Sequence, residues 1–484
     1  MLVRQLLNSY AQNIPDNLLV GGLSLNSKSI KQGDLFFALS GHKFDAKQFV
    51  FEAIERGAVA IVSEQLLFTS LNVPQIVIPN LREQLSFIAK KFYAYPAENT
   101  SITGVTGTNG KTSITYFLSF FLTQFSKKNA IIGTLGWGEL NNLQSSDLTT
   151  PDPFKLFQYL HTLDEAGCRE IVMEVSSIAL DQHRVDAVNF DYAVFTNLQH
   201  DHLDYHLDMG NYGKAKERLF LDLEVKTSII NVDDVFGKVL LNKLANISKI
   251  SYGYSDHADL RIVDVHCAGN MTKVMMNIFG QNIEFETNLC GVFNIYNLSA
   301  VLATLLSKGY QLLDILPFFK MLPSVPGRMQ RIDTNKGWMV IIDYAHTPDA
   351  LKVVLQTIKR QFNGKIWCVF GCGGSRDKEK RPIMGRYASE FADYVILTSD
   401  NPRNEDPKNI VCDILKGIDD QGNCTVELDR KKAIYFALSQ AKANEIVLIA
   451  GRGHEQYQIF KDYYEPFNDY KVVMDFLYLN QNII

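Results

Sequence analysis

Short apolar runs rich in β-branched residues recur along the whole chain, separated by longer stretches with helical periodicity. The runs that predict strands are residues 58–62, 75–78, 101–105, 170–175, 192–196, 228–232, 339–344, 366–370, 394–398 and 445–450. Such alternation is typical of parallel sheets that are flanked by helices. We therefore predict an α/β fold throughout. Ligands of these sheets collect where the strands end, so functional residues are expected directly after the runs.

Two stretches interrupt this alternation and indicate domain boundaries. Residues 93–100 (YAYPAENT) precede the run at 101–105, and residues 322–328 (LPSVPGR) contain prolines and a glycine that would end any helix. We predict three domains, at residues 1–97, 98–325 and 326–484, all of plausible domain size. The central sheet should be mainly parallel, and the C-terminal domain should be Rossmann-like.

The composition is that of an ordinary folded protein. Hydrophobic residues make up 46% and charged residues 21% of the 484 residues, which excludes a largely disordered chain. The formal charge of −5, from 48 basic and 53 acidic residues, argues against general binding of nucleic acid. The seven cysteines are scattered without a Cys-x-x-Cys pair, which suits a reducing compartment. Because we find no signal peptide and no apolar stretch of about 18 residues, we expect a cytoplasmic protein with no membrane partner.

A glycine-rich turn follows the run at 101–105. It is Thr106-Gly107-Thr108-Asn109-Gly110-Lys111-Thr112-Ser113, and the almost wholly apolar residues 114–125 come next. In such a turn backbone N–H groups surround phosphate, the lysine adds a cation and the threonine hydroxyl can reach Mg²⁺. Five residues separate Gly104 from Gly110, where the common P-loop motif has four. We predict a P-loop-type sheet with a nucleoside triphosphate site, which by itself does not distinguish a kinase, switch, motor or ligase.

Polar residues also follow other strands of the central segment. They are Thr149, Thr150, Ser176, Gln182 and Arg184. Glu174 stands late in the otherwise apolar run at 170–175, where a carboxylate is costly unless it meets a cation. It can belong to a structural ion pair, or it can be a ligand of Mg²⁺ beside the phosphate loop.

The segment after the run at 192–196 is rich in histidine and acidic residues. His200-x-His202-x-Asp204 can wrap a zinc ion, but Tyr205 follows instead of another histidine. The alternatives are solvated surface histidines and a supporting role for His202 near a magnesium nucleotide. Lys216, further along, is typical of a solvated helix lysine when taken alone.

Together these segments resemble the Mur ligases of bacterial cell-wall synthesis, three-domain enzymes that form amide bonds with ATP. The resemblance rests on the phosphate loop with its unusual spacing and on three further segments in the expected order. These are residues 174–177 (EVSS), Asn197 with residues 201–206 (DHLDYH), and residues 294–297 (NIYN). The resemblance implies that Lys216 is carbamylated by CO₂, which replaces an ammonium by carboxylate-like oxygens suited to Mg²⁺. It also implies catalytic roles for Lys111, His202 and Lys216, metal ligands at Thr112, Glu174, His202 and Lys216, and nucleotide contacts from residues 107–113, Asn294 and Asp343.

The first segment contains loops that are simply polar when taken alone. Residues 25–28 (LNSK) and 40–45 (SGHKFD) follow short strand-like runs. They resemble the uridine-nucleotide-binding loops of the tripeptide-forming family members, although the usual Asp-Ser-Arg is here Asn26-Ser27-Lys28. The resemblance implies substrate contacts from Leu25, Ser27, His42, Lys43 and Phe44.

In the third segment the run at 394–398 leads into Ser399-Asp400-Asn401-Pro402-Arg403. An arginine on a turn held by proline suits bidentate capture of a carboxylate, and an arginine on a solvated turn is the plain alternative. The Asp-Asn-Pro-Arg sequence resembles the family members that add meso-diaminopimelate, whereas lysine-adding members lack the arginine. A site for the extra carboxylate of diaminopimelate should reject lysine, because the arginine would stay unpaired. The implied pocket consists of Arg376, Asp400, Asn401, Pro402, Arg403, Gly451 and Glu455, with Glu455 placed for the distal ammonium.

The resemblance thus implies an ATP-dependent ligase that adds meso-2,6-diaminopimelate to UDP-N-acetylmuramoyl-L-alanyl-D-glutamate through an acyl phosphate, in peptidoglycan precursor synthesis. The acceptor would lie against the polar residues between Thr149 and Arg184 named above. We expect ATP, Mg²⁺ and a carbamate on Lys216 as cofactors, small-molecule substrates, and a monomer. Two alternatives stay open. A folylpolyglutamate-type ligase should lack the uridine-binding first domain, and a P-loop switch or binding module would need no amino-acid pocket. The run at 378–381 (KEKR) is more typical of a solvated helix start than of a site.

Overall fold

The computed structural model describes residues 1–11, 14–39, 41, 45–95, 100–244, 248–269, 271–419 and 421–481. The chain forms two compact units, one of residues 1–261 with 296–311 and the other of residues 262–295 with 312–484. It passes between them within β12 (Leu260–Ala268), within α10 (Val292–Ser307) and after residue 311. Among the helices that are described, none has the length and apolar composition that crossing a membrane requires.

The first unit begins with a four-stranded parallel sheet of order β1-β2-β3-β4. Its elements are α1 (Val3–Leu7), β1 (Gly22–Ser24), β2 (Asp34–Ala38), α2 (Val50–Glu55), β3 (Ala60–Ser63), β4 (Gln75–Val77) and α3 (Leu81–Phe92), with 3-10 turns at Ser27–Ser29 and Ala46–Phe49. One hydrophobic core joins Leu35 and Ile88 of this sheet and its helices to Ile102 and Phe157 of the segment that follows. The two segments are therefore packed as one body.

This unit also holds most of a ten-stranded sheet, and its part has the strand order β11-β10-β9-β5-β8-β6-β7, in which only the pair β6–β7 is antiparallel. Its strands are β5 (Ser101–Thr106), β6 (Asn129–Gly133), β7 (Gly136–Gly138), β8 (Glu170–Glu174), β9 (Phe190–Phe195), β10 (Val225–Asn231) and β11 (Ser248–Gly253). Its helices are α4 (Lys111–Gln124), α5 (Pro153–Glu165), α6 (Ser177–Asp181), α7 (Leu203–His206), α8 (Met209–Leu221), α9 (Val235–Lys243) and part of α10.

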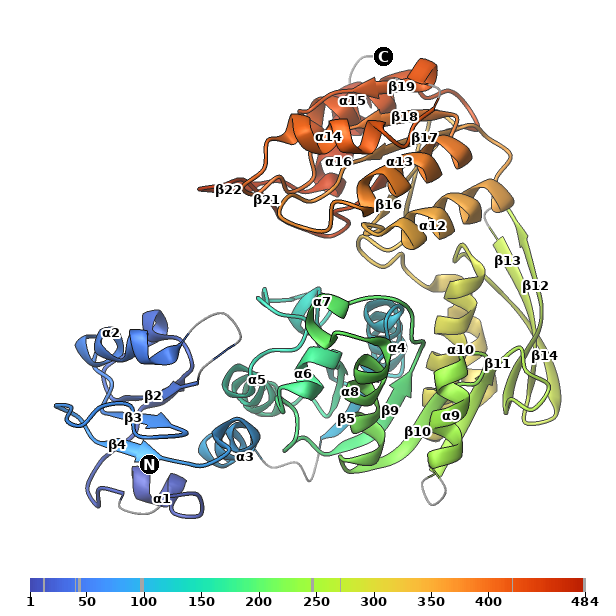
Figure 1. The fold of residues 1–484 in the computed structure, drawn as a ribbon. Helices are drawn as coiled ribbons and strands as arrows, with labels where there is room; N and C mark the ends of the chain where they lie inside the picture. Colours follow the sequence, from blue (N-terminus) through green and yellow to red (C-terminus); the bar gives the residue numbers. More distant parts are fainter. Residues whose placement is uncertain are drawn as a thin grey trace. The chain divides into compact units, whose positions relative to one another are not determined.

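Right-handed connections that run in opposite directions along a parallel sheet place their helices on opposite faces of the sheet. Helix α4 accordingly covers one face, while α5, α6 and α8 cover the other (Figure 1). Strands β8, β5 and β9 are neighbours, so the segments that follow their carboxyl ends meet at one edge. The predicted phosphate loop, Glu174 and the histidine-rich segment all start there.

The second unit contains the antiparallel hairpins β13–β14 and β21–β22 and a six-stranded sheet of order β15-β16-β20-β17-β18-β19, which is parallel apart from β15. Its strands are β13 (Met271–Ile278), β14 (Gln281–Thr287), β15 (Gln330–Asp333), β16 (Met339–Asp343), β17 (Ile366–Phe370), β18 (Tyr394–Leu397), β19 (Cys424–Val426), β20 (Ile446–Ala450), β21 (Tyr457–Ile459) and β22 (Tyr464–Pro466). Its helices are α11 (Leu312–Ile315), α12 (Pro348–Gln361), α13 (Lys380–Phe391), α14 (Pro407–Leu415), α15 (Arg430–Gln440) and α16 (Asp469–Gln481), with 3-10 turns at Leu316–Met321 and Gln421–Asn423.

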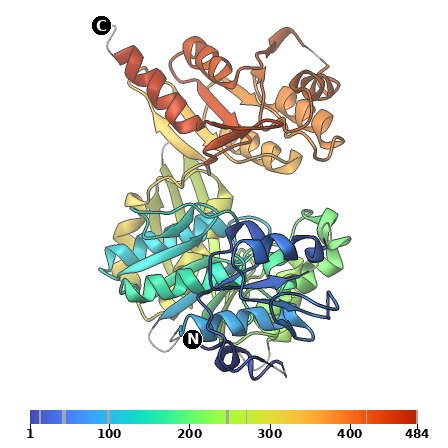
Figure 2. The same ribbon diagram turned by 90° about the vertical axis from the view of Figure 1, so that its left-hand side faces the viewer.

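Two hydrophobic cores hold this six-stranded sheet. Leu351, Met384 and Ile414, from α12, α13 and α14, belong to the core on one face. Ile434 and Val473, from α15 and α16, belong to the core on the other face (Figure 1 and Figure 2). The α/β prediction is confirmed, because each predicted apolar run coincides with a strand to within a few residues. The domain boundaries at residues 97 and 325 remain predictions.

Candidate functional site

The loop between β5 and α4 has a backbone that requires glycine at two positions. Gly107 and Gly110 have φ angles of +145° and +92°. A side chain at Gly107 would collide with the hydroxyl of Thr196, and one at Gly110 would lie 2.6 Å from Oδ1 of Asn297. Nζ of Lys111 donates to the carbonyls of Gly107 (2.7 Å) and Thr108 (2.9 Å), so its charge lies over the loop. A glycine loop, a helix start and a cation together form a phosphate-binding arrangement.

The other predicted loop residues are tied to the segment after β9. The N–H of Thr108 donates to the carbonyl of Asn197 (2.8 Å), and the N–H of Asn109 donates to Oδ1 of the same residue (3.0 Å). Ser113 is buried in the first turn of α4. The loop is therefore held in shape by hydrogen bonds to a neighbouring strand end.

Glu174 ends β8 and is buried, with 1% of its surface exposed. Its Oε2 accepts from the hydroxyls of Thr112 (3.0 Å) and Thr134 (3.1 Å), and its Oε1 accepts from the N–H of Thr134 (2.8 Å). Within the described residues all of these partners are neutral, so the alternative of a structural ion pair is not found. A buried carboxylate with neutral donors beside a phosphate loop suits a bound cation. Thr134 was not predicted from the sequence.

Lys216 lies on α8 and is buried, with 1% of its surface exposed, so the alternative of a solvated lysine is wrong. Its Nζ donates to the carbonyl of Gly107 (2.9 Å) and lies 4.4 Å from the centre of the Tyr212 ring. Burial, together with the charge of Lys111, holds the pKa of the Lys216 amine well below its usual value. Burial and the neighbouring charge thus shift this amine toward its uncharged form beside the phosphate loop.

His202 directly precedes α7 and has a positive φ of +54°, and 47% of its side chain is exposed. Burial of the rest of the ring, reinforced by the charge of Lys111, lowers the pKa of His202 and favours the neutral imidazole. His200 is exposed. Across the described part of the chain, three or more His, Cys, Asp or Glu side chains nowhere form a group that could hold a metal ion.

The residues predicted to hold the acceptor lie together next to Glu174. Oγ1 of Thr150 donates to the carbonyl of Glu174 (2.9 Å), and Nη1 of Arg184 donates to the carbonyl of Thr150 (2.8 Å). Nη2 of Arg184 donates to Oε1 of Gln182 (2.7 Å). The structure also places Thr149 and Ser176 in this patch, through contacts with Thr134 and Thr150. Its role in binding stays a prediction.

The predicted residues of the first sheet are only partly described. Ser27 is 4% exposed, and its hydroxyl donates to Oε2 of Glu52 (2.6 Å). Leu25 packs against the core of the first unit. His42, Lys43 and Phe44 lie outside the described residues.

Two predicted nucleotide contacts belong to the second unit. The amide of Asn294, at the start of α10, donates to the carbonyl of Cys290 (2.8 Å). Asp343 ends β16 and accepts from the N–H groups of Met329 (2.7 Å) and Ala345 (2.8 Å), while burial raises the pKa of its carboxyl. Their contacts with nucleotide stay predictions. Asn297, in the same motif as Asn294, is the residue that lies against Gly110.

In the second unit, the loops after β17 and β18 bring two predicted arginines together. A side chain at Gly373 would lie 2.8 Å from Nη1 of Arg403 and 3.7 Å from Cγ of Arg376. Arg403 has a φ of +51°, and its Nη1 donates to the carbonyls of Gly374 (3.1 Å) and Asn401 (3.4 Å). The other guanidinium nitrogens donate to none of the described residues, so one edge of the fork is available for a carboxylate.

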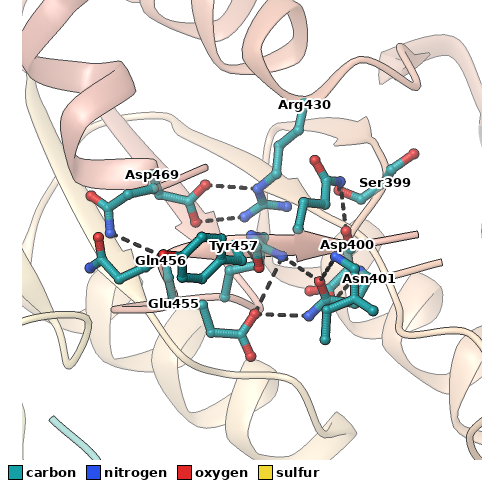
Figure 3. Close-up of polar contacts among 12 residues, drawn as sticks. Ser399, Asp400, Asn401, Arg430, Glu455, Gln456, Tyr457 and Asp469 are labelled. Carbon is teal, nitrogen blue, oxygen red and sulfur yellow. Dashed lines mark hydrogen bonds and ion pairs between the residues drawn. The ribbon is translucent and has the colours of Figure 1, made fainter. Parts of the chain in front are cut away.

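The turn after β18 also meets the loop after β20. Nδ2 of Asn401 donates to Oε2 of Glu455 (2.8 Å), as Figure 3 shows. Gly451 has a φ of +109°, and a side chain there would lie 2.7 Å from Oδ2 of Asp400. Burial and the neighbouring Asp400 raise the pKa of Glu455, so a cation beside this carboxylate would be favoured. Together with the buried Pro402, the predicted pocket residues lie on adjoining loops of one unit.

Arg381 departs from the prediction of a solvated helix start at residues 378–381. It is completely buried, and it donates from Nη1 to Asp413 (3.0 Å) and from Nη2 to Glu405 (3.1 Å). Glu405 in turn accepts from the N–H of Ser375. The prediction of a solvated position is therefore wrong for Arg381. Through Glu405, this arginine connects the loop that contains Arg376 with the turn that contains Arg403.

A second buried arginine, Arg430, donates from Nη2 to the carbonyl of Ala450 (3.0 Å), directly before Gly451. Arg430 and Asp469 are both completely buried and form two hydrogen bonds of 2.8 Å each (Figure 3). We expect Asp469→Asn to lower the free energy of unfolding by about 3–5 kcal/mol, because it leaves the guanidinium buried without its counter-charge. Chemical denaturation measures this loss. Asp475→Asn, at an exposed position of the same helix, should change stability by less than about 0.5 kcal/mol. A loss below about 1 kcal/mol in Asp469→Asn would contradict the expectation.

These sites define the class of the protein. It is an α/β protein in which one unit carries a phosphate-binding loop and the other carries arginine and carboxylate side chains on adjoining loops.

Models of one family match three successive segments of the chain. The Mur ligase family catalytic domain matches residues 19–93, the Mur ligase middle domain matches residues 105–305, and the Mur ligase glutamate ligase domain matches residues 327–453. The UDP-N-acetylmuramoyl-L-alanyl-D-glutamate–2,6-diaminopimelate ligase of Aquifex aeolicus is 43% identical to this chain over 458 residues, which cover 95% of this chain and 94% of that protein. The chain belongs to the Mur ligase family.

Solved structures agree with this assignment. The structure of a protein that carries the same ligase name covers 100% of this chain and 99% of its own, with 33% identity and a TM-score of 0.70. The folylpolyglutamate synthase of Mycobacterium tuberculosis, solved with ADP and AMPPCP, shares the fold at 17% identity and a TM-score of 0.63. That match covers 76% of this chain and 92% of the synthase.

Proposed function

We propose that this chain adds meso-2,6-diaminopimelate to UDP-N-acetylmuramoyl-L-alanyl-D-glutamate with ATP, during peptidoglycan precursor synthesis in the cytoplasm. The observation that carries the proposal is the pocket of the second unit. It presents an unpaired edge of Arg403 for a carboxylate and the partly buried Glu455 for an ammonium. Diaminopimelate carries both groups at its distal end, whereas lysine carries only the ammonium. The proposal includes that the protein acts as a monomer and has no nucleic-acid partner. The net charge of −5 supports the absence of a nucleic-acid partner.

The proposed reaction has two steps. A carboxylate oxygen of the acceptor attacks the γ-phosphorus of ATP, and ADP leaves with the electrons of the broken bond. The amine of diaminopimelate, having lost a proton, then attacks the acyl carbon, and phosphate leaves from the tetrahedral intermediate. Lys111, over the phosphate loop, neutralises charge that develops on the transferred phosphoryl group. The patch that includes Thr150 and Arg184 orients the acceptor beside it.

Mg²⁺ fits the residues at the loop, because Glu174 is a buried carboxylate with only neutral donors among the described residues. Thr112, Glu174, His202 and carbamylated Lys216 would hold it. When bound, the ion supplies charge neutralisation of the phosphate oxygens. Lys216 is suited to carbamylation because its buried, uncharged amine is the form that adds CO₂, releasing one proton.

A phosphate-release assay tests the proposal. With ATP and UDP-N-acetylmuramoyl-dipeptide, release should require meso-diaminopimelate, and L-lysine should be used at least about a thousandfold less efficiently. Release that depends on a folate and glutamate would instead indicate a folylpolyglutamate-type ligase. Hydrolysis of ATP that depends on neither co-substrate would indicate a P-loop switch.

A further inference from the structure

Arg452 is a completely buried arginine in the loop after β20, and its side chain contacts the turn after β18. It follows Gly451 and precedes Glu455, and the proposed function gives it no role. Burial of a guanidinium is costly unless its donors find partners. The contacts of Arg452 therefore indicate what it holds in place.

Those contacts run to both loops. Nη1 of Arg452 donates to Oδ1 of Asn401 (2.7 Å) and lies 3.3 Å from Oε2 of Glu455. Nη2 donates to the carbonyl of Tyr457 (2.7 Å), and the guanidinium carbon lies 5.6 Å from the centre of the Phe467 ring. Both terminal nitrogens of the Arg452 guanidinium thus have hydrogen-bond partners.

The contact with Asn401 decides the orientation of that amide. Oδ1 of Asn401 accepts from Arg452 and also from the N–H of Ile459 (2.8 Å). Both partners can only donate, so the flipped amide would place an NH₂ group against two donors. Nδ2 of Asn401 must therefore face Glu455, to which it donates over 2.8 Å.

Glu455 is fixed as a consequence. Its Oε2 is occupied by Asn401 and Arg452, whereas its Oε1 has no hydrogen-bond partner within the described residues and points away from them in Figure 3. The side chain keeps 30% of its surface exposed. One carboxylate oxygen is therefore presented in a single direction to whatever binds in the pocket.

We infer that Arg452 is a positioning residue for the amino-acid substrate. It fixes the amide of Asn401, which in turn holds Glu455 so that its second oxygen receives an ammonium group. The inference rests on the proposed function, because it takes this ammonium to be the distal amine of diaminopimelate.

Steady-state ligation kinetics of Arg452→Met test the inference. Methionine retains much of the buried volume but removes every donor. Loss of these charged hydrogen bonds should raise the KM for meso-diaminopimelate by about ten- to a hundredfold. The KM values for ATP and for UDP-N-acetylmuramoyl-dipeptide should stay within about twofold of the wild type, because Arg452 contacts neither proposed site. Arg452→Lys keeps the charge and one donor for Asn401, and it should recover most of the affinity.

A double-mutant cycle with Glu455→Gln separates positioning from a general structural role. If Arg452 acts through Glu455, Arg452→Met should add less than about twofold to the KM of Glu455→Gln. Fully additive effects would overturn the inference, and so would an unchanged KM in Arg452→Met. Should Arg452→Met fail to fold, Arg452→Gln takes its place with the same two outcomes. A wild-type protein without diaminopimelate-dependent phosphate release would refute the proposed function instead, so the two failures are distinguishable.

Discussion

Replacement of Lys216 by alanine is expected to reduce ligation turnover by about a thousandfold. The Lys216 amine is buried, lies 2.9 Å from the carbonyl of Gly107, and has a pKa held low by burial and by Lys111. Carbamylation would turn this uncharged group into an oxygen ligand for the cation that neutralises the phosphoryl group. Alanine removes that ligand without disturbing the surface of α8.

Chemical rescue separates a carbamate from an ordinary lysine. Acetate or another short carboxylic acid should restore part of the activity of Lys216→Ala, because it can supply carboxylate oxygens where the carbamate lay. A short alkylamine should not. Lys214→Ala, at an exposed position of the same helix, is the matched control and should keep full activity. Rescue by the amine alone, or wild-type turnover in Lys216→Ala, would show that no carbamate is needed.

The parts of the fold that the sequence predicts well are those in which buried strands form continuous apolar runs. The run at 366–370 coincides fully with β17, because both faces of that strand are covered by helices. The hairpin β13–β14 was missed for the opposite reason. Along β13 exposed and buried positions alternate, so Met271–Ile278 contains no unbroken apolar run. Period-two patterns of this kind indicate a sheet with one face in water.

The phosphate loop was predictable because its chemistry is local, with glycines, Lys111 and Thr112 within one turn. The contacts that surround the other site residues could not be predicted from the sequence. Lys216 is buried by contacts that include a carbonyl 109 residues away, and Glu174 finds Thr134 at a separation of 40 residues. The pairing of Arg452 with Asn401 spans 51 residues. Such partners are set by strand order, which a single sequence does not reveal.

Replacement of Arg403 by alanine is expected to lower kcat/KM for meso-diaminopimelate by about a hundredfold or more. Nη1 of Arg403 is used by the carbonyls of Gly374 and Asn401, and this fixes the guanidinium while one edge stays available. A carboxylate bound to that edge would form two parallel, charge-assisted hydrogen bonds. Alanine removes both hydrogen bonds. The backbone strain of a φ of +51° is the same for alanine as for arginine, so the substitution does not relieve it.

The co-substrate decides what the loss in Arg403→Ala means. Any residual addition of L-lysine should be unchanged or slightly improved, because lysine has no distal carboxylate to lose a partner. Arg403→Lys keeps the charge without the planar fork and should recover only part of the activity with diaminopimelate. Arg386→Ala, an exposed arginine on α13, should behave as the wild type with both amino acids. An equal loss of kcat/KM with diaminopimelate and with lysine would contradict carboxylate recognition. It would show that Arg403 shapes the pocket without binding the distal carboxylate that distinguishes the two substrates.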